Sequence, residues 1–276
     1  MAKRPNYYLF LLGLALILIV LLYPKQVEPF QSNPSTVICL MCVCPTESVV
    51  RFAEQLSPIY KVYIVCDDPS CSTPDSSAIT YLKITDNECI AAGYNRSNPA
   101  IPKIPSAWDK ALYYFCVKDT TPQHVWFIEE DVFVPRPTLL SDIDAKYPTT
   151  DLIAKQNVEK TEDPAFMWWH EADGVFNPPI YRSLVCASRL SRKLLIKIDE
   201  FVQKNNRLVF IEILFNTIVH HEKMTLAMPE QLSTIIWRHD WTHETVDEEH
   251  MFHPVKNVAL HDSYRERLSQ IAAREN

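Results

Sequence analysis

The sequence predicts an α/β fold in which a mixed, mostly parallel sheet is flanked by helices. Short apolar runs typical of strands alternate with segments of helical periodicity through the first half of the chain, and such alternation implies parallel connections. Two of the apolar runs also end directly in acidic residues, at 67–68 and at 129–131. Ligands of open α/β sheets gather beyond the carboxyl ends of the strands, so both acidic groups are expected at one shared site.

The expected elements follow from these runs and their boundaries. In the first half, we expect strands at 37–43, 60–66, 80–84 and 125–128, and helices at 47–56 and 107–117. Ser106 precedes the second helix and is expected to cap it. The second half is mixed, with a strand expected at 151–155 and helices at 189–204, 210–220 and 263–274.

Composition excludes several classes of protein. The 276 residues are 47% hydrophobic and carry a formal net charge of -7. That length can bury one substantial core or two closely fused lobes, and the hydrophobic content is too high for a disordered chain. The acidic balance argues against nucleic acid as a partner, because polyanion binding needs a concentrated basic face.

Glycine is scarce, which restricts how a nucleotide can be bound. The only glycines are Gly13, Gly93 and Gly174. A Walker A loop and a dinucleotide fingerprint both need clustered glycines so that the backbone can approach phosphate. A bound diphosphate therefore requires another source of positive charge, and a metal ion is the natural substitute.

The N-terminus predicts a membrane anchor. Lys3 and Arg4 precede an unbroken apolar run that is closed by Tyr23 and Pro24, and its length is at the short end of a membrane span. The basic end should stay cytosolic. We expect a cytosolic tail at 1–8, a transmembrane signal anchor at 9–23, a stem at 24–36 and a luminal domain at 37–276. A cleaved signal peptide is the alternative.

The cysteines fit an oxidising compartment. The chain has eight of them, as is common in secretory proteins. Cys66 and Cys71 bracket a proline-containing loop and are candidates for a local disulfide. Cys39 and Cys42 have CxxC spacing but lie on an expected strand, where positions three apart face opposite sides. A zinc or redox motif is therefore not expected at that pair.

Three consecutive acids, Glu129, Glu130 and Asp131, lie between the apolar runs 125–128 and 132–134. Carboxylates this close to a core must be compensated. Mg²⁺ or Mn²⁺, bound by one or two carboxylates plus substrate phosphates, would provide that compensation. The alternative is a solvated turn between two strands.

This segment resembles the GT-A fold glycosyltransferases, which carry an acidic Asp-x-Asp-type motif at the end of a core strand. It is similar to the Glu-Asp-Asp motif of N-acetylglucosaminyltransferase I-like enzymes, with Glu130 in place of the middle Asp. The resemblance implies that Asp131 binds the metal directly. It also implies that Glu129 and Glu130 lie near the ribose and the metal-bound waters.

Further segments extend the resemblance over most of residues 36–256. By this resemblance, Asp67 and Asp68 at the end of the second strand contact the nucleotide, and Lys110 on the following helix faces the diphosphate. Residues 181–191 look like the segment that leads into the acceptor-side helix. The luminal domain would then be a GT-A-like catalytic domain.

Two carboxylates are candidates for the catalytic base. An inverting transfer needs a carboxylate to deprotonate the acceptor hydroxyl as it attacks the anomeric carbon. Glu212 lies where these enzymes usually carry an acidic residue, and its apolar neighbours argue against a solvated position. Asp173 is the rival candidate.

A histidine and a lysine near the C-terminus complete the expected site. GT-A enzymes commonly add a C-terminal histidine ligand and a basic residue. The resemblance therefore implies that His253 is a metal ligand and that Lys256 contacts the diphosphate, since imidazole suits Mn²⁺ and ammonium suits phosphate. His250 and His261 are competitors for the ligand role.

Two aromatic groups have two interpretations each. Trp168, Trp169 and His170 form one group and residues 237–241 the other. Exposed tryptophans can stack on sugar faces, and burial in the core is the alternative. The histidines show neither a HExxH motif nor a regular zinc spacing.

Together these observations predict a metal-dependent glycosyltransferase of the Golgi or ER membrane. It would move a sugar, with inversion, from a nucleotide-sugar donor such as a UDP-sugar to a glycan or glycoprotein acceptor. Two alternatives remain open: an inactive glycan- or protein-binding member of the fold, and another luminal metal-dependent transferase such as a phosphotransferase.

Overall fold

The structure, a computed structural model, describes residues 35–68, 70–100 and 103–275, which belong to one compact unit. The expected cytosolic tail at 1–8, the anchor at 9–23 and nearly all of the stem lie outside these ranges. Within the described ranges, none of the helices combines the length and the apolar character that a membrane span requires.

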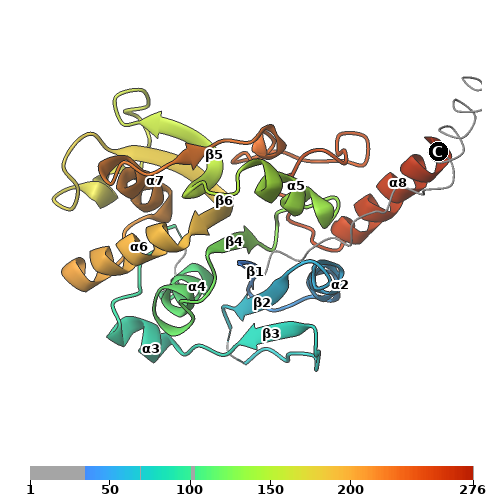
Figure 1. The fold of residues 1–276 in the computed structure, drawn as a ribbon, viewed down its shortest axis with the longest axis horizontal. Helices are drawn as coiled ribbons and strands as arrows, with labels where there is room; N and C mark the ends of the chain where they lie inside the picture. The colour runs from blue at the N-terminus through green and yellow to red at the C-terminus, as the bar shows by residue number, and fades with distance from the viewer. Residues whose placement is uncertain (1–34, 69, 101–102, 276) are drawn as a thin grey trace, which may run out of the picture. The chain divides into compact units, whose positions relative to one another are not determined.

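The core is a seven-stranded sheet in the order β3-β2-β1-β4-β6-β5-β7. The strands are β1 (Thr36–Cys42), β2 (Lys61–Cys66), β3 (Ile79–Leu82), β4 (His124–Glu129), β5 (Leu152–Glu159), β6 (Tyr181–Ser191) and β7 (Leu226–Ala227). Only β6 runs antiparallel to its neighbours, β4 and β5, whereas the other pairs are parallel. The expected mixed, mostly parallel sheet is therefore confirmed (Figure 1).

Helices cover both faces of this sheet (Figure 1). They are α2 (Glu47–Leu56), α3 (Asp86–Ala91), α4 (Ala107–Tyr113), α5 (Thr138–Lys146), α6 (Arg192–Asn205), α7 (Ile211–His221) and α8 (Leu260–Glu275). Side chains of the central strands alternate between two cores because successive positions point to opposite faces. One core packs against α4, α6 and α7, and the other against α2 and α5.

Ser106 is the N-cap residue of α4, as expected, but its capping contact is different. The Asp109 carboxylate accepts hydrogen bonds from the Ser106 backbone N–H at 2.7 Å and from its hydroxyl at 3.0 Å. Asp109 also accepts from the Ser97 backbone N–H at 2.9 Å. The Asp109 carboxylate therefore fixes the start of α4, the helix whose Trp108 contacts Glu129 at the end of β4.

The helix expected at 189–204 begins only at Arg192, because the preceding residues complete β6. Arg189 is the reason that this strand is hard to recognise. It is 1% exposed, yet it lies in a strand interior, where its guanidinium pairs with Asp144 at 2.5 Å. The strand expected at 151–155 is likewise longer than predicted and extends to Glu159.

Asp144 on α5 joins three elements of the second core. Its carboxylate accepts hydrogen bonds from Tyr60 Oη at 2.7 Å and Trp126 Nε1 at 3.0 Å, besides the Arg189 ion pair. A buried charge is tolerated only where such partners satisfy it. This network therefore holds α5 against β4 and β6.

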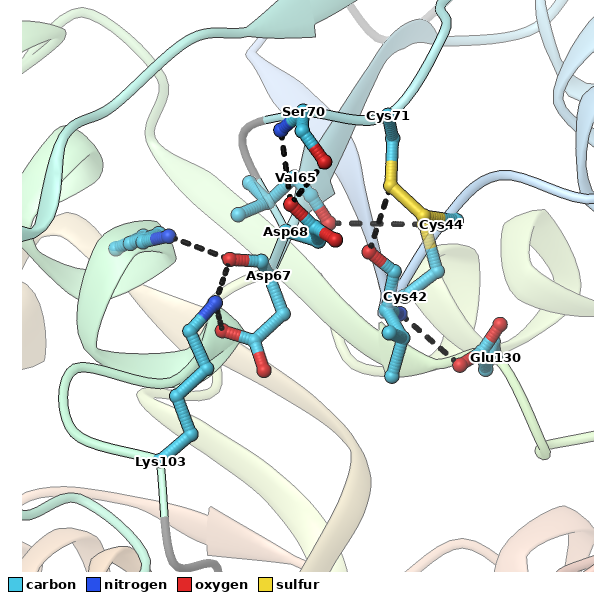
Figure 2. The surroundings of a disulfide bond; sticks show 11 residues. Cys42, Cys44, Val65, Asp67, Asp68, Ser70, Cys71, Lys103 and Glu130 are labelled. Atoms are coloured by element: carbon cyan, nitrogen blue, oxygen red, sulfur yellow. Dashed lines mark hydrogen bonds and ion pairs between the residues drawn. A yellow bond between two sulfur atoms is a disulfide. The ribbon is translucent and has the colours of Figure 1, made fainter.

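The disulfide links Cys44 and Cys71 (Figure 2), so the expected pairing of Cys66 with Cys71 is wrong. Cys66 is a strand residue placed directly opposite Cys42 in the parallel register of β1 and β2, whereas Cys44 follows β1 and meets the loop after β2. Cys39 and Cys42 face the two different cores. The expectation that this CxxC pair forms no joint motif is thus confirmed.

Candidate active site

A cavity of about 1430 Å³ opens at the carboxyl ends of β1, β2 and β4. This is the edge at which parallel strands present their loops to ligands. Segments distant in sequence close it, including the start of α7 and the loops before α8. Its lining includes Asp67, Glu129, Glu130, Asp131, Glu212, His253 and Lys256.

Asp131 lies at the centre of the charged groups in this cavity. Its Oδ2 is 3.6 Å from His253 Nε2, and Glu129 Oε2 is 4.0 Å from the same nitrogen. Lys256 Nζ pairs directly with Asp131 Oδ2. The Asp131 carbonyl also accepts from the Val255 N–H at 2.8 Å, so the backbone fixes the segment that carries both cationic side chains against the acidic turn.

The charges of these groups are strongly linked. Burial opposes ionisation of Asp131, but the hydrogen bonds and charges of His253 and Lys256 outweigh it and lower its pKa to about 2. Burial and then the neighbouring Asp131 charge raise the pKa of Glu129. Carboxylates that share a buried cavity disfavour each other's ionisation unless positive charge lies between them. The arrangement therefore favours a cation.

Two hydrogen bonds orient the groups that face one another. Trp108 Nε1–H donates to Glu129 Oε1 at 2.6 Å, which leaves Oε2 toward the histidine. His253 Nδ1 lies 2.8 Å from the Ile236 carbonyl oxygen, so Nδ1 carries a hydrogen, and Nε2, which faces Asp131, can act as a ligand once it gives up its own proton. Such outer hydrogen bonds fix the tautomer and direction of metal-binding side chains.

Glu130 performs a different task in the same cavity. Its Oε1 accepts from the Val43 backbone N–H at 3.0 Å, as Figure 2 illustrates. The contact connects the end of β4 to the residue that follows β1. Glu130 therefore stabilises the rim, in addition to any contact that it makes with a ligand.

Glu212 lies in the first turn of α7 and is 5% exposed. Burial raises its pKa to about 8, against the opposing charge of Arg182. Among the described residues, no hydrogen bond to its carboxyl is found. A carboxyl with a raised pKa and no partner, in the wall of a charged cavity, has the character of a catalytic acid or base.

Three predicted site residues do not line the cavity, as far as the described residues define it. Lys110 Nζ is 2.7 Å from the Asp67 carbonyl oxygen and 2.8 Å from Asp86 Oδ1, so its ammonium is already engaged. Asp68 accepts from the N–H and hydroxyl of Ser70 (Figure 2). Asp173 is exposed and lies 3.7 Å from Lys160.

Several residues in or beside the cavity were not singled out from the sequence. Lys103 lies beside the lining residue Asp67, with its Nζ 3.0 Å from Asp67 Oδ1 (Figure 2), and it follows a proline-rich stretch without any motif. Trp108 and Cys186 line the cavity itself. Both approach Glu129 through strand and helix packing between distant segments, which no local pattern reveals.

The two aromatic groups lie in different environments. Trp169 is buried in the core, so the core interpretation holds for it. Residues 237–241 line the cavity instead, and Trp237 is 57% exposed there. Of the competing histidines, His250 pairs with Asp247 and His261 packs against Phe133.

Comparison with known proteins gives structural neighbours only, since no protein-family model and no curated protein matches the chain. Galactosyltransferase LgtC, in complex with donor and acceptor sugar analogs, is 11% identical, with a TM-score of 0.45, over 85% of this chain and 96% of its own. Mouse xyloside xylosyltransferase 1 is 9% identical, with a TM-score of 0.37, over 72% and 86%.

Glucosyl-3-phosphoglycerate synthase from Mycobacterium tuberculosis, in complex with Mn²⁺, UDP and glucosyl-3-phosphoglycerate, is 13% identical, with a TM-score of 0.35, over 83% and 75%. These neighbours are GT-A glycosyltransferases, the group that the sequence resembles. Likenesses of this strength do not assign an activity.

Proposed function

We propose that the protein is a glycosyltransferase that requires a divalent cation and a nucleotide-sugar donor, most simply a UDP-sugar. The observation that carries this proposal is the convergence of Glu129, Asp131, His253 and Lys256 in one cavity with Glu212. A purely structural network of ion pairs would not account for the buried Glu212 carboxyl in the same cavity, which has no hydrogen-bond partner among the described residues. A transfer site needs both a place for negative leaving-group charge and a base.

The residues fit a divalent cation. Carboxylate oxygens of Asp131 and Glu129 converge on His253 Nε2 at 3.6 and 4.0 Å, and oxygen and imidazole ligands suit Mn²⁺, with Mg²⁺ as the oxygen-preferring alternative. When bound, the cation supplies positive charge to the diphosphate leaving group. This positive charge replaces the glycine-rich backbone loop with which other proteins bind a diphosphate, and which this chain lacks glycines to form.

The remaining steps are assigned to side chains. Lys256, whose side chain reaches Asp131 from an exposed position, turns to the diphosphate as a point charge. Glu212 takes the proton of the acceptor hydroxyl. At the same time the hydroxyl oxygen bonds to the anomeric carbon, and the bond from that carbon to the diphosphate breaks. Attack from the face opposite the leaving group gives inversion. The acceptor is a glycan or glycoprotein.

We further infer that the chain is a single-pass protein of the Golgi or ER membrane, anchored by residues 9–23 with the catalytic domain in the lumen. The basic start and the apolar run support this topology. The Cys44–Cys71 disulfide supports an oxidising compartment. Protease-accessibility assays on intact microsomes would test it, and digestion of the catalytic domain by protease added outside sealed vesicles would contradict it.

The function is tested with a donor screen on the full chain in detergent. Several nucleotide sugars are incubated with Mn²⁺, with Mg²⁺ or with a chelator, and released nucleoside diphosphate is measured. We expect release only with a cation, and faster release when an acceptor glycan is present. No release and no cation-dependent thermal shift would indicate a binding protein, and a phosphorylated product would indicate a phosphotransferase.

A further inference from the structure

Cys186 lies beside Glu129 and His253, two of the side chains that line the proposed cation site. A carboxylate oxygen of Glu129, the Cys186 sulfur and an imidazole nitrogen of His253 all lie within 4.8 Å of one another. The β4–β6 register explains the position of the thiol, because it pairs Ile128 with Ala187 at the end of β4. One step further along this antiparallel pair, Cys186 meets Glu129.

The three side chains are held in place by the protein. Cys186 and His253 are buried, and Glu129 is half-buried. The outer hydrogen bonds from Trp108 to Glu129 and from His253 to the Ile236 carbonyl direct Glu129 Oε2 and His253 Nε2 toward each other. A chance cluster on a mobile surface would lack such partners.

The chemistry of this set differs from that of the site with Asp131. Mg²⁺ and Mn²⁺ favour oxygen ligands, whereas a sulfur, an imidazole nitrogen and a carboxylate oxygen together favour Zn²⁺. Three protein ligands with a fourth position open to a cavity are typical of reactive zinc sites. The cavity beside these residues provides the space for a water or a phosphate oxygen.

We propose that Glu129, Cys186 and His253 form a Zn²⁺ site that shares two of its ligands with the Mn²⁺ or Mg²⁺ site. Binding displaces the proton of the Cys186 thiol and the proton of His253 Nε2, and both leave to solvent. Because the two sites share His253 and Glu129, one ion excludes the other. Zn²⁺ therefore competes with the cation that supports transfer; this consequence, unlike the site itself, rests on the proposed function.

The site is tested by titrating the metal-stripped full chain with Co²⁺, which replaces Zn²⁺ and reports sulfur ligation by a charge-transfer absorption band. We expect the band in the wild-type protein and its displacement by Zn²⁺. It should be absent from Cys186→Ser, whose Zn²⁺ affinity should fall by more than the roughly 10- to 100-fold that loss of an outer partner costs. His253→Gln, which keeps every thiol, should also lose the band.

Cys66→Ser is the matched control, because Cys66 is a free, partly exposed thiol outside the three-residue group. Its band should be unchanged. A missing band in the wild-type protein, a band that survives Cys186→Ser, or a band lost only in Cys66→Ser would each overturn the site. The Co²⁺ titration contains no sugar donor and therefore does not depend on the proposed function. A protein that shows the band in this titration but transfers no sugar in the donor screen would refute the proposed function and leave the Zn²⁺ site intact.

Discussion

Replacement of Glu212 by Gln should stabilise the protein and inactivate it at the same time. Glu212 is almost fully buried, and burial raises its pKa from an ordinary value of 4.5 to about 8. Between these two pH values the folded protein binds more protons at this position than the unfolded chain. The contribution of Glu212 to stability is therefore favourable at low pH and is lost as pH rises toward 8.

The magnitude follows from the interval between the two pKa values. It corresponds to roughly 5 kcal/mol at about 1.4 kcal/mol per pH unit, and water that reaches the cavity makes this an upper bound. Glutamine has nearly the same shape but does not titrate. Relative to wild type, Glu212→Gln should thus gain up to about 5 kcal/mol at about pH 8.5, and this gain should nearly vanish at about pH 5.

Urea unfolding of the full chain at several pH values measures this difference. Glu222→Gln is the matched control, because Glu222 ends the same helix in an exposed position, and it should show no such pH dependence. Transfer by Glu212→Gln should fall about 100- to 10,000-fold, and wild-type activity should rise with pH toward 8 as the base loses its proton. A stability difference that is the same at every pH would show that folding does not raise the proton affinity of Glu212.

Three other predictions concern the frame around the site. Asp144→Ala leaves the buried Arg189 guanidinium without its carboxylate and should cost roughly 3–5 kcal/mol in urea unfolding; a loss below about 1 kcal/mol would contradict this. Joint replacement of Cys44 and Cys71 by Ser opens a loop with a sequence separation of 27 and should cost roughly 3–4 kcal/mol, whereas reducing agent should no longer affect the double variant. Trp108→Phe keeps the packing but removes the indole N–H donated to the carboxylate at the end of β4; Mn²⁺ affinity measured by calorimetry should fall about 10- to 100-fold, and unchanged affinity would show that the hydrogen bond does not orient a ligand.

Much of the first half of the fold was predictable because its strands are buried on both faces. Such strands read as continuous apolar runs, and the run 125–128 ends directly at Glu129. The carboxyl ends of parallel neighbours meet at one edge, so Asp67 and Glu129 could be placed together. The position of each acidic residue could be predicted because it directly follows its strand in the sequence.

The remainder depends on pairings that the sequence does not display. The antiparallel insertion of β6 between β4 and β5 brings Cys186 to Glu129, and nothing near either residue indicates it. The end of the same strand was not recognised because it contains Arg189, a charged residue that is not expected inside a buried strand. Its burial depends on the ion pair with Asp144 on α5, which is distant in the sequence. Lys110 was expected to face a diphosphate, yet Asp86 and the Asp67 carbonyl engage its ammonium.

We propose that the acidic turn after β4 holds a cation that neutralises a nucleoside diphosphate. Calorimetry of UDP binding to the full chain, with Mn²⁺ and with chelator, in wild type and in Asp131→Asn, decides whether it does. We predict that UDP binds wild type only with Mn²⁺, and that Asp131→Asn, in which the carboxylate paired with Lys256 and facing His253 is neutral, loses this dependence together with the binding. UDP binding of equal affinity in chelator, or in the variant, would contradict the account.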